Sequence, residues 1–180
     1  MFLPILLAVA SAVPPPSAPE SFSARAWSLY ATVVVHDLWP DKSPFSGVVV
    51  DGTPDTIAAV EYDTGKLIIG YGLIAQVREE DDVAFVAAHE AAHLLLQHQR
   101  QYRKKRGSYV VDYALMERQE KEADAYAFKL LRLRGRDPCA GRRIIQRLFD
   151  RFNADTMPLD PFYEMQVNRL DDLKKTCPAP

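Results

Sequence analysis

Hydrophobic and polar positions predict a chain of helices that is interrupted once, early on, by a short β region. Apolar residues recur at helical spacing over residues 24–36, which predicts a first helix. A short strand is expected at residues 48–50. Residues 57–62 and 66–69 are rich in β-forming side chains, and the turn sequence Asp63-Thr64-Gly65 between them predicts a β-hairpin.

Further helices are expected after the hairpin. The first of them covers residues 83–99, where a run rich in alanine and leucine follows four carboxylates and precedes several basic residues. This charge pattern complements the helix macrodipole. The others are expected at residues 112–134, 140–152 and 162–175. We therefore predict an α+β fold, in which several helices pack on a small β-hairpin sheet and the alanine-rich helix is central.

The first 23 residues differ from the rest of the chain. Residues 2–10 are apolar and uncharged, and Ala10-Ser11-Ala12 is a small-residue cleavage sequence, so residues 1–12 are predicted to be a signal peptide. No basic residue follows Met1, which leaves a disordered apolar tail or a misassigned start codon as the alternative. Residues 13–23 are typical of a proline-rich linker, and residues 24–180 of a single domain. The leader predicts a periplasmic or secreted protein.

Composition narrows the classes of function. The chain has 180 residues and a formal net charge of −2, which does not favour binding to nucleic acid. It contains no uninterrupted apolar run of about 18 residues, so no stable membrane span is expected. The two cysteines, Cys139 and Cys177, are too few for a cysteine-rich metal cluster. In an oxidising compartment they would form a disulfide, and the alternative is two free thiols.

The alanine-rich helix carries the motif His89-Glu90-Ala91-Ala92-His93. Histidines four residues apart lie on one face of a helix, so both imidazoles can bind one zinc ion. Glu90 lies beside that face and can contact a water at the metal. It would act as the general base that takes a proton from this metal-activated water. The alternative is a purely structural pair of histidines.

A third ligand is needed, and the remaining histidines do not suit this role. His36 precedes the β region, and His98 follows His93 by five residues on the same predicted helix, off the metal-facing side. Carboxylates of the next helix are therefore candidates. Glu120 and Asp124 share a helical face, which suits a ligand glutamate and an aspartate that hydrogen-bonds a ligand histidine. A solvated helix face is the alternative reading of this charged run.

Together the two motifs resemble the HtpX-like metallopeptidases, the gluzincin family that includes the CAAX prenyl endopeptidases and periplasmic BepA-type proteases. The family pattern is HExxH followed on a later helix by ExxAD, which is Glu120-Lys121-Glu122-Ala123-Asp124 here. The resemblance implies a minimal zincin-like domain with one zinc ion per chain, Glu120 as the third zinc ligand, and Asp124 as the partner of a ligand histidine. It also implies a metalloendopeptidase that hydrolyses peptide bonds in a peptide or unfolded protein.

The resemblance extends to residues 57–74 and implies that a hairpin strand lies above the metal and pairs with extended substrate. An open strand edge offers main-chain hydrogen bonds to any sequence. The alternative is an ordinary core strand. Our candidate edge strand consists of Lys66, Leu67, Ile68, Ile69 and Gly70.

The chain departs from the family pattern in two places. Ala58 replaces an asparagine, and Leu159-Asp160-Pro161 stands where the family has a His-Pro pair before its last helix. The missing histidine leaves metal binding intact but bears on catalysis, so Tyr163 and Arg169 are candidate donors to a developing oxyanion. A zinc-bound scaffold or regulatory protein with little turnover is therefore the alternative to an endopeptidase. A metal hydrolase acting on small substrates is a third hypothesis.

Overall fold

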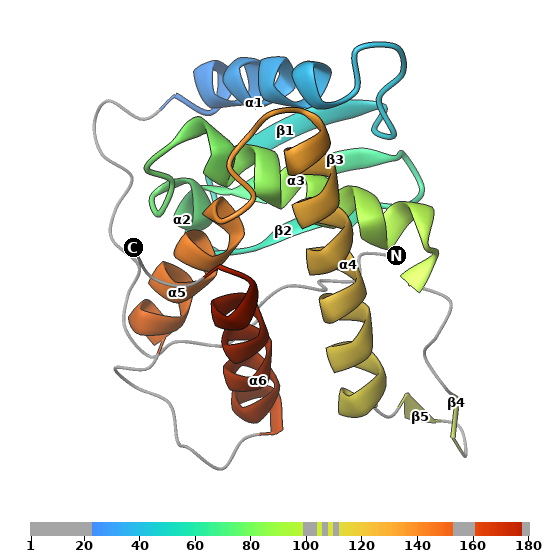
Figure 1. The fold of residues 1–180 in the computed structure, drawn as a ribbon. Helices are drawn as coiled ribbons and strands as arrows, with labels where there is room; N and C mark the ends of the chain where they lie inside the picture. The colour runs from blue at the N-terminus through green and yellow to red at the C-terminus, as the bar shows by residue number, and fades with distance from the viewer. Residues whose placement is uncertain (1–22, 99–103, 106–107, 110–111, 153–160, 178–180) are drawn as a thin grey trace.

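The computed structural model describes residues 23–98, 104–105, 108–109, 112–152 and 161–177 (Figure 1). The predicted signal peptide and residues 13–22 of the predicted linker lie outside this part of the chain. Helices surround a small three-stranded sheet, which confirms the predicted α+β class. The elements in chain order are α1 (Ala24–Leu38), β1 (Gly47–Asp51), β2 (Ala58–Glu61), β3 (Lys66–Gly70), α2 (Tyr71–Ile74), α3 (Glu80–Leu95), β4 (Lys104–Lys105), β5 (Ser108–Tyr109), α4 (Tyr113–Leu133), α5 (Ala140–Phe152) and α6 (Pro161–Thr176).

The first helix, α1, is capped by one serine and hydrogen-bonded to the sheet by another. Ser23 caps the N-terminus of α1, where its hydroxyl accepts from the N–H of Ala26 at 3.2 Å. One turn later, the hydroxyl of Ser28 accepts from the N–H of Val50 in β1 at 2.8 Å. The face of α1 that carries Val34 and Leu38 is buried against β1 and α3. The helix therefore covers one side of the sheet.

The order of the strands corrects one expectation. The sheet runs β1-β3-β2, with β1 parallel and β2 antiparallel to β3. Ile68, for example, lies opposite Val49 on one side and Ala59 on the other. The expectation that residues 66–70 form an edge strand is therefore wrong, because β1 occupies their second side. The edges of this sheet are β1 and β2.

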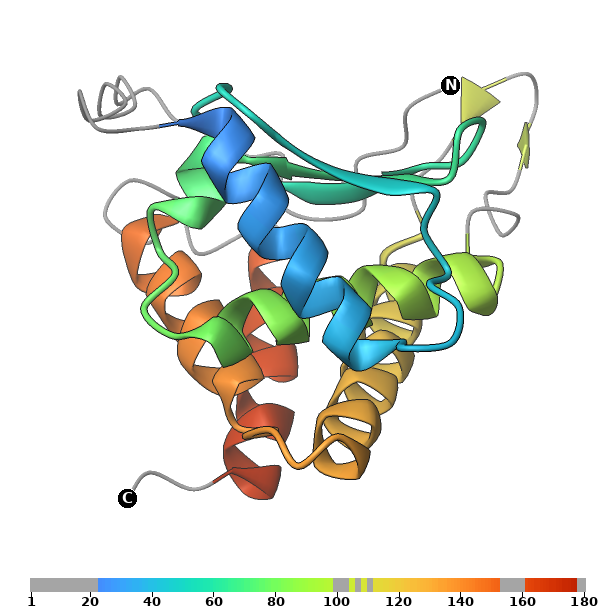
Figure 2. The ribbon, with the colours of Figure 1, turned by 90° about the horizontal axis from the view of Figure 1, so that it is seen from above.

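Helix α3 runs through the middle of the molecule, where it contacts α1, β2, α4 and α5 (Figure 2). Every residue from 82 to 93 is buried. Glu79 and Asp82 form a capping box at its start, and the Asp82 carboxylate accepts from the N–H of Glu79 at 3.2 Å. The helix ends at Leu95, earlier than the predicted residue 99, and Gln97 turns the chain with a φ of 57°.

Helices α5 and α6 pack beside α3 and α4 on the side away from α1. Gly141 at the start of α5 lies so close to Phe85 of α3 that a Cβ there would overlap the phenyl ring. Cys139 and Cys177 form a disulfide, with Cα atoms 5.5 Å apart, that ties the start of α5 to the end of α6. No helix among the described residues is both long and apolar enough to cross a bilayer.

Candidate metal centre

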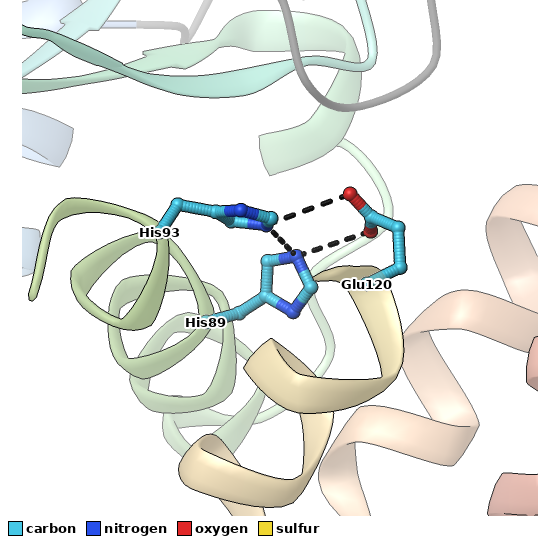
Figure 3. A group of neighbouring side chains, drawn as sticks. All are labelled: His89, His93 and Glu120. Atoms are coloured by element: carbon cyan, nitrogen blue, oxygen red, sulfur yellow. Dashed lines mark hydrogen bonds and ion pairs between the residues drawn. The ribbon is translucent and has the colours of Figure 1, made fainter. Parts of the chain in front are cut away.

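Three side chains from α3 and α4 converge on one point (Figure 3). His89 and His93 lie one turn apart on α3, and their Nε2 atoms are 3.0 Å from each other. Glu120 of α4 faces both rings, with its Oε2 3.3 Å from His89 Nε2 and its Oε1 3.5 Å from His93 Nε2. The three donor atoms lie within 4.8 Å of one another, and all three residues are buried. The structure thus brings together the predicted ligands.

Several polar atoms of this cluster have no hydrogen-bond partner within the protein. Both carboxylate oxygens of Glu120 and Oε1 of Glu90 are buried without a hydrogen-bond partner. Buried polar atoms in native proteins nearly always have one, so a carboxylate that faces two imidazole nitrogens with neither oxygen hydrogen-bonded indicates a missing partner. Two histidines and one glutamate are a common donor set for zinc with an open position. The residues present therefore fit a zinc ion.

Asp124 and Arg169 hold the ligands from behind. Asp124 Oδ1 lies 2.9 Å from His89 Nδ1, so this nitrogen donates its hydrogen, and Nε2 is the nitrogen that faces the cluster and can bind a metal once it has lost its own proton. Arg169 of α6 donates from Nε and Nη2 to the two Asp124 oxygens, at 2.6 and 2.7 Å. Its Nη1 forms an ion pair with Glu120 at 2.7 Å, without the alignment of a hydrogen bond. Asp124 therefore orients His89, as expected.

Arg169 and Tyr163, the two candidate oxyanion donors, are each in contact with other side chains. The guanidinium of Arg169 is 1% exposed and is engaged by Asp124 and Glu120. Tyr163 packs against Phe149, with ring centroids 5.4 Å apart. Residues 159–160, where the family histidine would fall, lie outside the described residues. The sequence pattern identified Arg169 but assigned it to substrate, because the buried carboxylates that pair with it come from a different helix.

Burial and the positive charge of Arg169 together determine whether the carboxylates of the site are ionised. Burial alone would raise the pKa of Asp124, but the charge and hydrogen bonds of Arg169 outweigh it and lower this pKa to about 2. Against the same cost of burial, Arg169 also holds the pKa of Glu120 below its usual value. Both carboxylates are therefore ionised at neutral pH, as metal binding requires.

The pKa values of the two histidines and of Glu90 shift differently in the same buried site. Burial lowers the pKa of His93 to about 3, so this imidazole is neutral. Burial and Arg169 act in the same direction on His89, but its contacts with Asp124 and Glu120 outweigh them and raise its pKa to about 9. Burial raises the pKa of Glu90 to about 8. Without a metal ion, His89 thus holds a proton that zinc would displace.

One neighbour of the cluster, His98, differs from the sequence prediction. His98 was placed on a longer helix, off the metal-facing side, but the turn at Gln97 brings its ring back onto His93. Burial lowers the pKa of His98, although Glu122 acts in the opposite direction. No glycine or proline marks the end of α3, so the local pattern held no signal for this turn.

The fold and the candidate metal centre are those of a small zincin-like domain, and a comparison with known proteins supports one family. The model of peptidase family M48 matches residues 37–117, a stretch that includes His89, Glu90 and His93. This match supports the M48 family of zinc metallopeptidases and confirms the predicted resemblance at this level. Glu120, Asp124 and Arg169 lie beyond the matched residues. A search of curated proteins finds no match.

Proposed function

We propose that this protein is a zinc-dependent endopeptidase in which Glu90 is the general base. One observation carries the proposal: His89, His93 and Glu120 converge in a buried cluster, and Glu90 lies beside it on the same helix. We also propose that the protein belongs to the HtpX-like or BepA-like subgroup. One zinc ion per chain is proposed because the cluster supplies one set of three donors.

Glu90 is suited to move a proton. Zinc, when bound, lowers the pKa of a water and polarises the carbonyl of the peptide bond. Glu90 takes the proton of the attacking water and passes it to the leaving nitrogen. Its Oε1 has no hydrogen-bond partner in the protein, so this oxygen can accept the proton of a water beside the cluster.

The place proposed for the substrate moves from β3 to β2. The N–H of Gly70 donates to the carbonyl of Ile57 at 2.8 Å, so residues 59 and 61 of the antiparallel pair also face β3. The N–H and C=O groups of Ala58 and Val60 therefore point to the other edge of β2, with which no strand of the described chain pairs. Because β2 contacts α3, an extended peptide on this edge would run beside the helix that carries Glu90.

The alternative function is a zinc-bound scaffold or regulatory protein with little turnover. The engagement of Arg169 with two carboxylates favours it, because this side chain is then not free to bind an oxyanion. We expect the scaffold to bind zinc as the enzyme does. The two functions therefore differ in turnover alone.

Replacement of Glu90 by glutamine separates these functions. The full chain should contain zinc and cleave an unstructured peptide library, whereas Glu90→Gln should keep its zinc and cleave about 10²–10⁴-fold more slowly. Metal analysis and mass spectrometry of the digests measure both quantities. Glu117→Gln is the matched control, since Glu117 lies on α4 and pairs with Lys121 at 2.8 Å. Cleavage no faster than in Glu90→Gln would favour the scaffold, and a wild-type chain without zinc affinity would contradict both functions.

We also propose a periplasmic or secreted location with a cleaved leader. The apolar start of the chain and the cleavage sequence Ala10-Ser11-Ala12 support it. The pairing of Cys139 with Cys177 is a second support, because disulfides persist in oxidising compartments. Cell fractionation, with the N-terminal sequence of the recovered protein, tests the proposal. Recovery in the cytosol with Met1 retained would contradict it.

A further inference from the structure

His98 lies directly behind His93, on the side away from the metal-binding cluster. Its Nδ1 is 2.8 Å from His93 Nδ1, and its Nε2 is 3.2 Å from Glu122 Oε2 on α4. His98 is 1% exposed, whereas the Glu122 side chain is 49% exposed. A row of hydrogen bonds therefore leads from a buried metal ligand through one histidine to a carboxylate at the surface.

The backbone around His98 is built to hold this position. Gln97 has a φ of 57°, in the left-handed region that glycine usually occupies at the end of a helix. A side chain other than glycine in this region costs free energy and persists only where the surroundings enforce it. Gln119 of α4 supplies one such restraint, since its side-chain amide donates to the carbonyl of His98 at 3.0 Å. Helix α4 thus forms hydrogen bonds with both the main chain and the ring of His98.

Each donor in this row of hydrogen bonds meets an acceptor only if all the bonds run in one direction. His93 directs Nε2 toward His89 and Glu120, so a neutral His93 that binds metal there must carry its hydrogen on Nδ1. His98 Nδ1 must then accept this hydrogen, which leaves the hydrogen of a neutral His98 on Nε2, facing Glu122. In the reverse arrangement, a lone pair of His98 would face the Glu122 carboxylate, and neither atom could donate. Glu122 therefore selects the tautomer of His98, and His98 selects the tautomer of His93.

We propose that His98 and Glu122 are positioning residues that hold His93 in the tautomer and ring orientation needed to bind the metal. This inference rests on the proposed zinc centre. It gives the two ligand histidines separate supports of the same kind: Asp124 accepts from Nδ1 of His89, and His98 accepts from Nδ1 of His93. Such supports fix the orientation of a ligand and raise its affinity for the metal.

The tautomers can be observed in the wild-type protein without any substitution. In the zinc-loaded chain labelled with ¹⁵N-histidine, NMR should show His93 with its single ring hydrogen on Nδ1 and His98 with its hydrogen on Nε2. A His98 ring with its hydrogen on Nδ1 would overturn the proposal. This measurement stands even if a variant of His98 does not fold.

Three substitutions then test the effect on the metal. Zinc affinity, measured by competition with a chelator, should fall about 10–100-fold in His98→Leu. It should largely recover in His98→Asn, whose amide oxygen can accept from His93 Nδ1. Glu122→Ala should weaken zinc binding and, in the zinc-free chain, mix the tautomers of His93, whereas the control Glu117→Ala on the same helix should do neither. Zinc affinity within twofold of wild type in both His98→Leu and Glu122→Ala would overturn the proposal.

Failure of this inference differs from failure of the proposed function. If the wild-type chain bound no zinc, the metal centre itself would be wrong. If wild type and the His98 and Glu122 variants bound zinc equally well, the centre would stand and only the role of His98 would fall.

Discussion

At the scale of single residues, Glu120 is the one proposed metal donor that does not lie on α3. It is buried beside two histidines, and Arg169 keeps it ionised. We expect Glu120→Gln to lower zinc affinity by at least about 100-fold, because an amide oxygen is a much poorer ligand for zinc than a carboxylate. Metal content after dialysis against a weak chelator measures this loss. Zinc retention equal to that of Glu117→Gln would show that Glu120 is not a ligand.

The pKa values of His89 and Glu90 predict how the metal-free protein responds to pH. Folding raises the pKa of His89 from 6.5 to about 9 and that of Glu90 from 4.5 to about 8. The folded state therefore binds these protons more tightly than the unfolded state, and the stability that they contribute is lost as pH rises through these values. With a chelator present, the free energy of unfolding in urea should fall by a few kcal/mol between about pH 6 and pH 9.

Zinc provides the control for that experiment. Bound zinc displaces the proton of His89, so zinc affinity should rise over the same pH range and offset the loss of stability. A metal-free protein whose stability stayed level or increased from pH 6 to pH 9 would contradict the charge states assigned to the site.

At the scale of elements, β2 is the strand whose outer edge is proposed to bind the substrate. Val60→Pro removes the outward N–H of this edge and leaves the hydrogen bonds to β3 intact. We expect kcat/KM for peptide cleavage to fall about tenfold, the worth of one main-chain hydrogen bond, with zinc content unchanged. Val60→Ala is the matched control, because it also shortens this buried side chain but keeps the N–H. An equal loss in both variants would assign the effect to packing.

The local pattern of apolar and polar residues predicted most elements, because the periodicity of a helix or strand depends on residues that are close in sequence. The bounds of α5 agree with the expected residues 140–152, and α4 and α6 agree within about two residues. The failures concern partners that are distant in sequence. The pattern predicts a strand at residues 48–50, within β1, but does not predict its pairing with β3. In the same way, Arg169 and His98 act through contacts with α4, which no local pattern encodes.

At the scale of the molecule, the proposed metal centre depends on the docking of three helices. Helix α3 carries His89 and His93, α4 carries Glu120 and Asp124, and α6 contributes Arg169. Arg169 of α6 compensates the buried charges of Glu120 and Asp124, and losing the partner of a buried charge is strongly destabilising. Zinc binding and the packing of α6 should therefore be coupled.

The disulfide provides a test of this coupling, because it fastens the end of α6 to the start of α5. It closes a loop of 38 residues, so replacing both cysteines, Cys139 and Cys177, by serine should lower the free energy of unfolding by about 4 kcal/mol. If α6 then docks less firmly, Arg169 is less often in place and zinc affinity should fall as well. Urea unfolding and chelator competition, carried out on the same double variant, measure the two effects separately. Lower stability with unchanged zinc affinity would mean that contacts with α4 alone hold Arg169, and that the bridge stabilises the fold without supporting the metal centre.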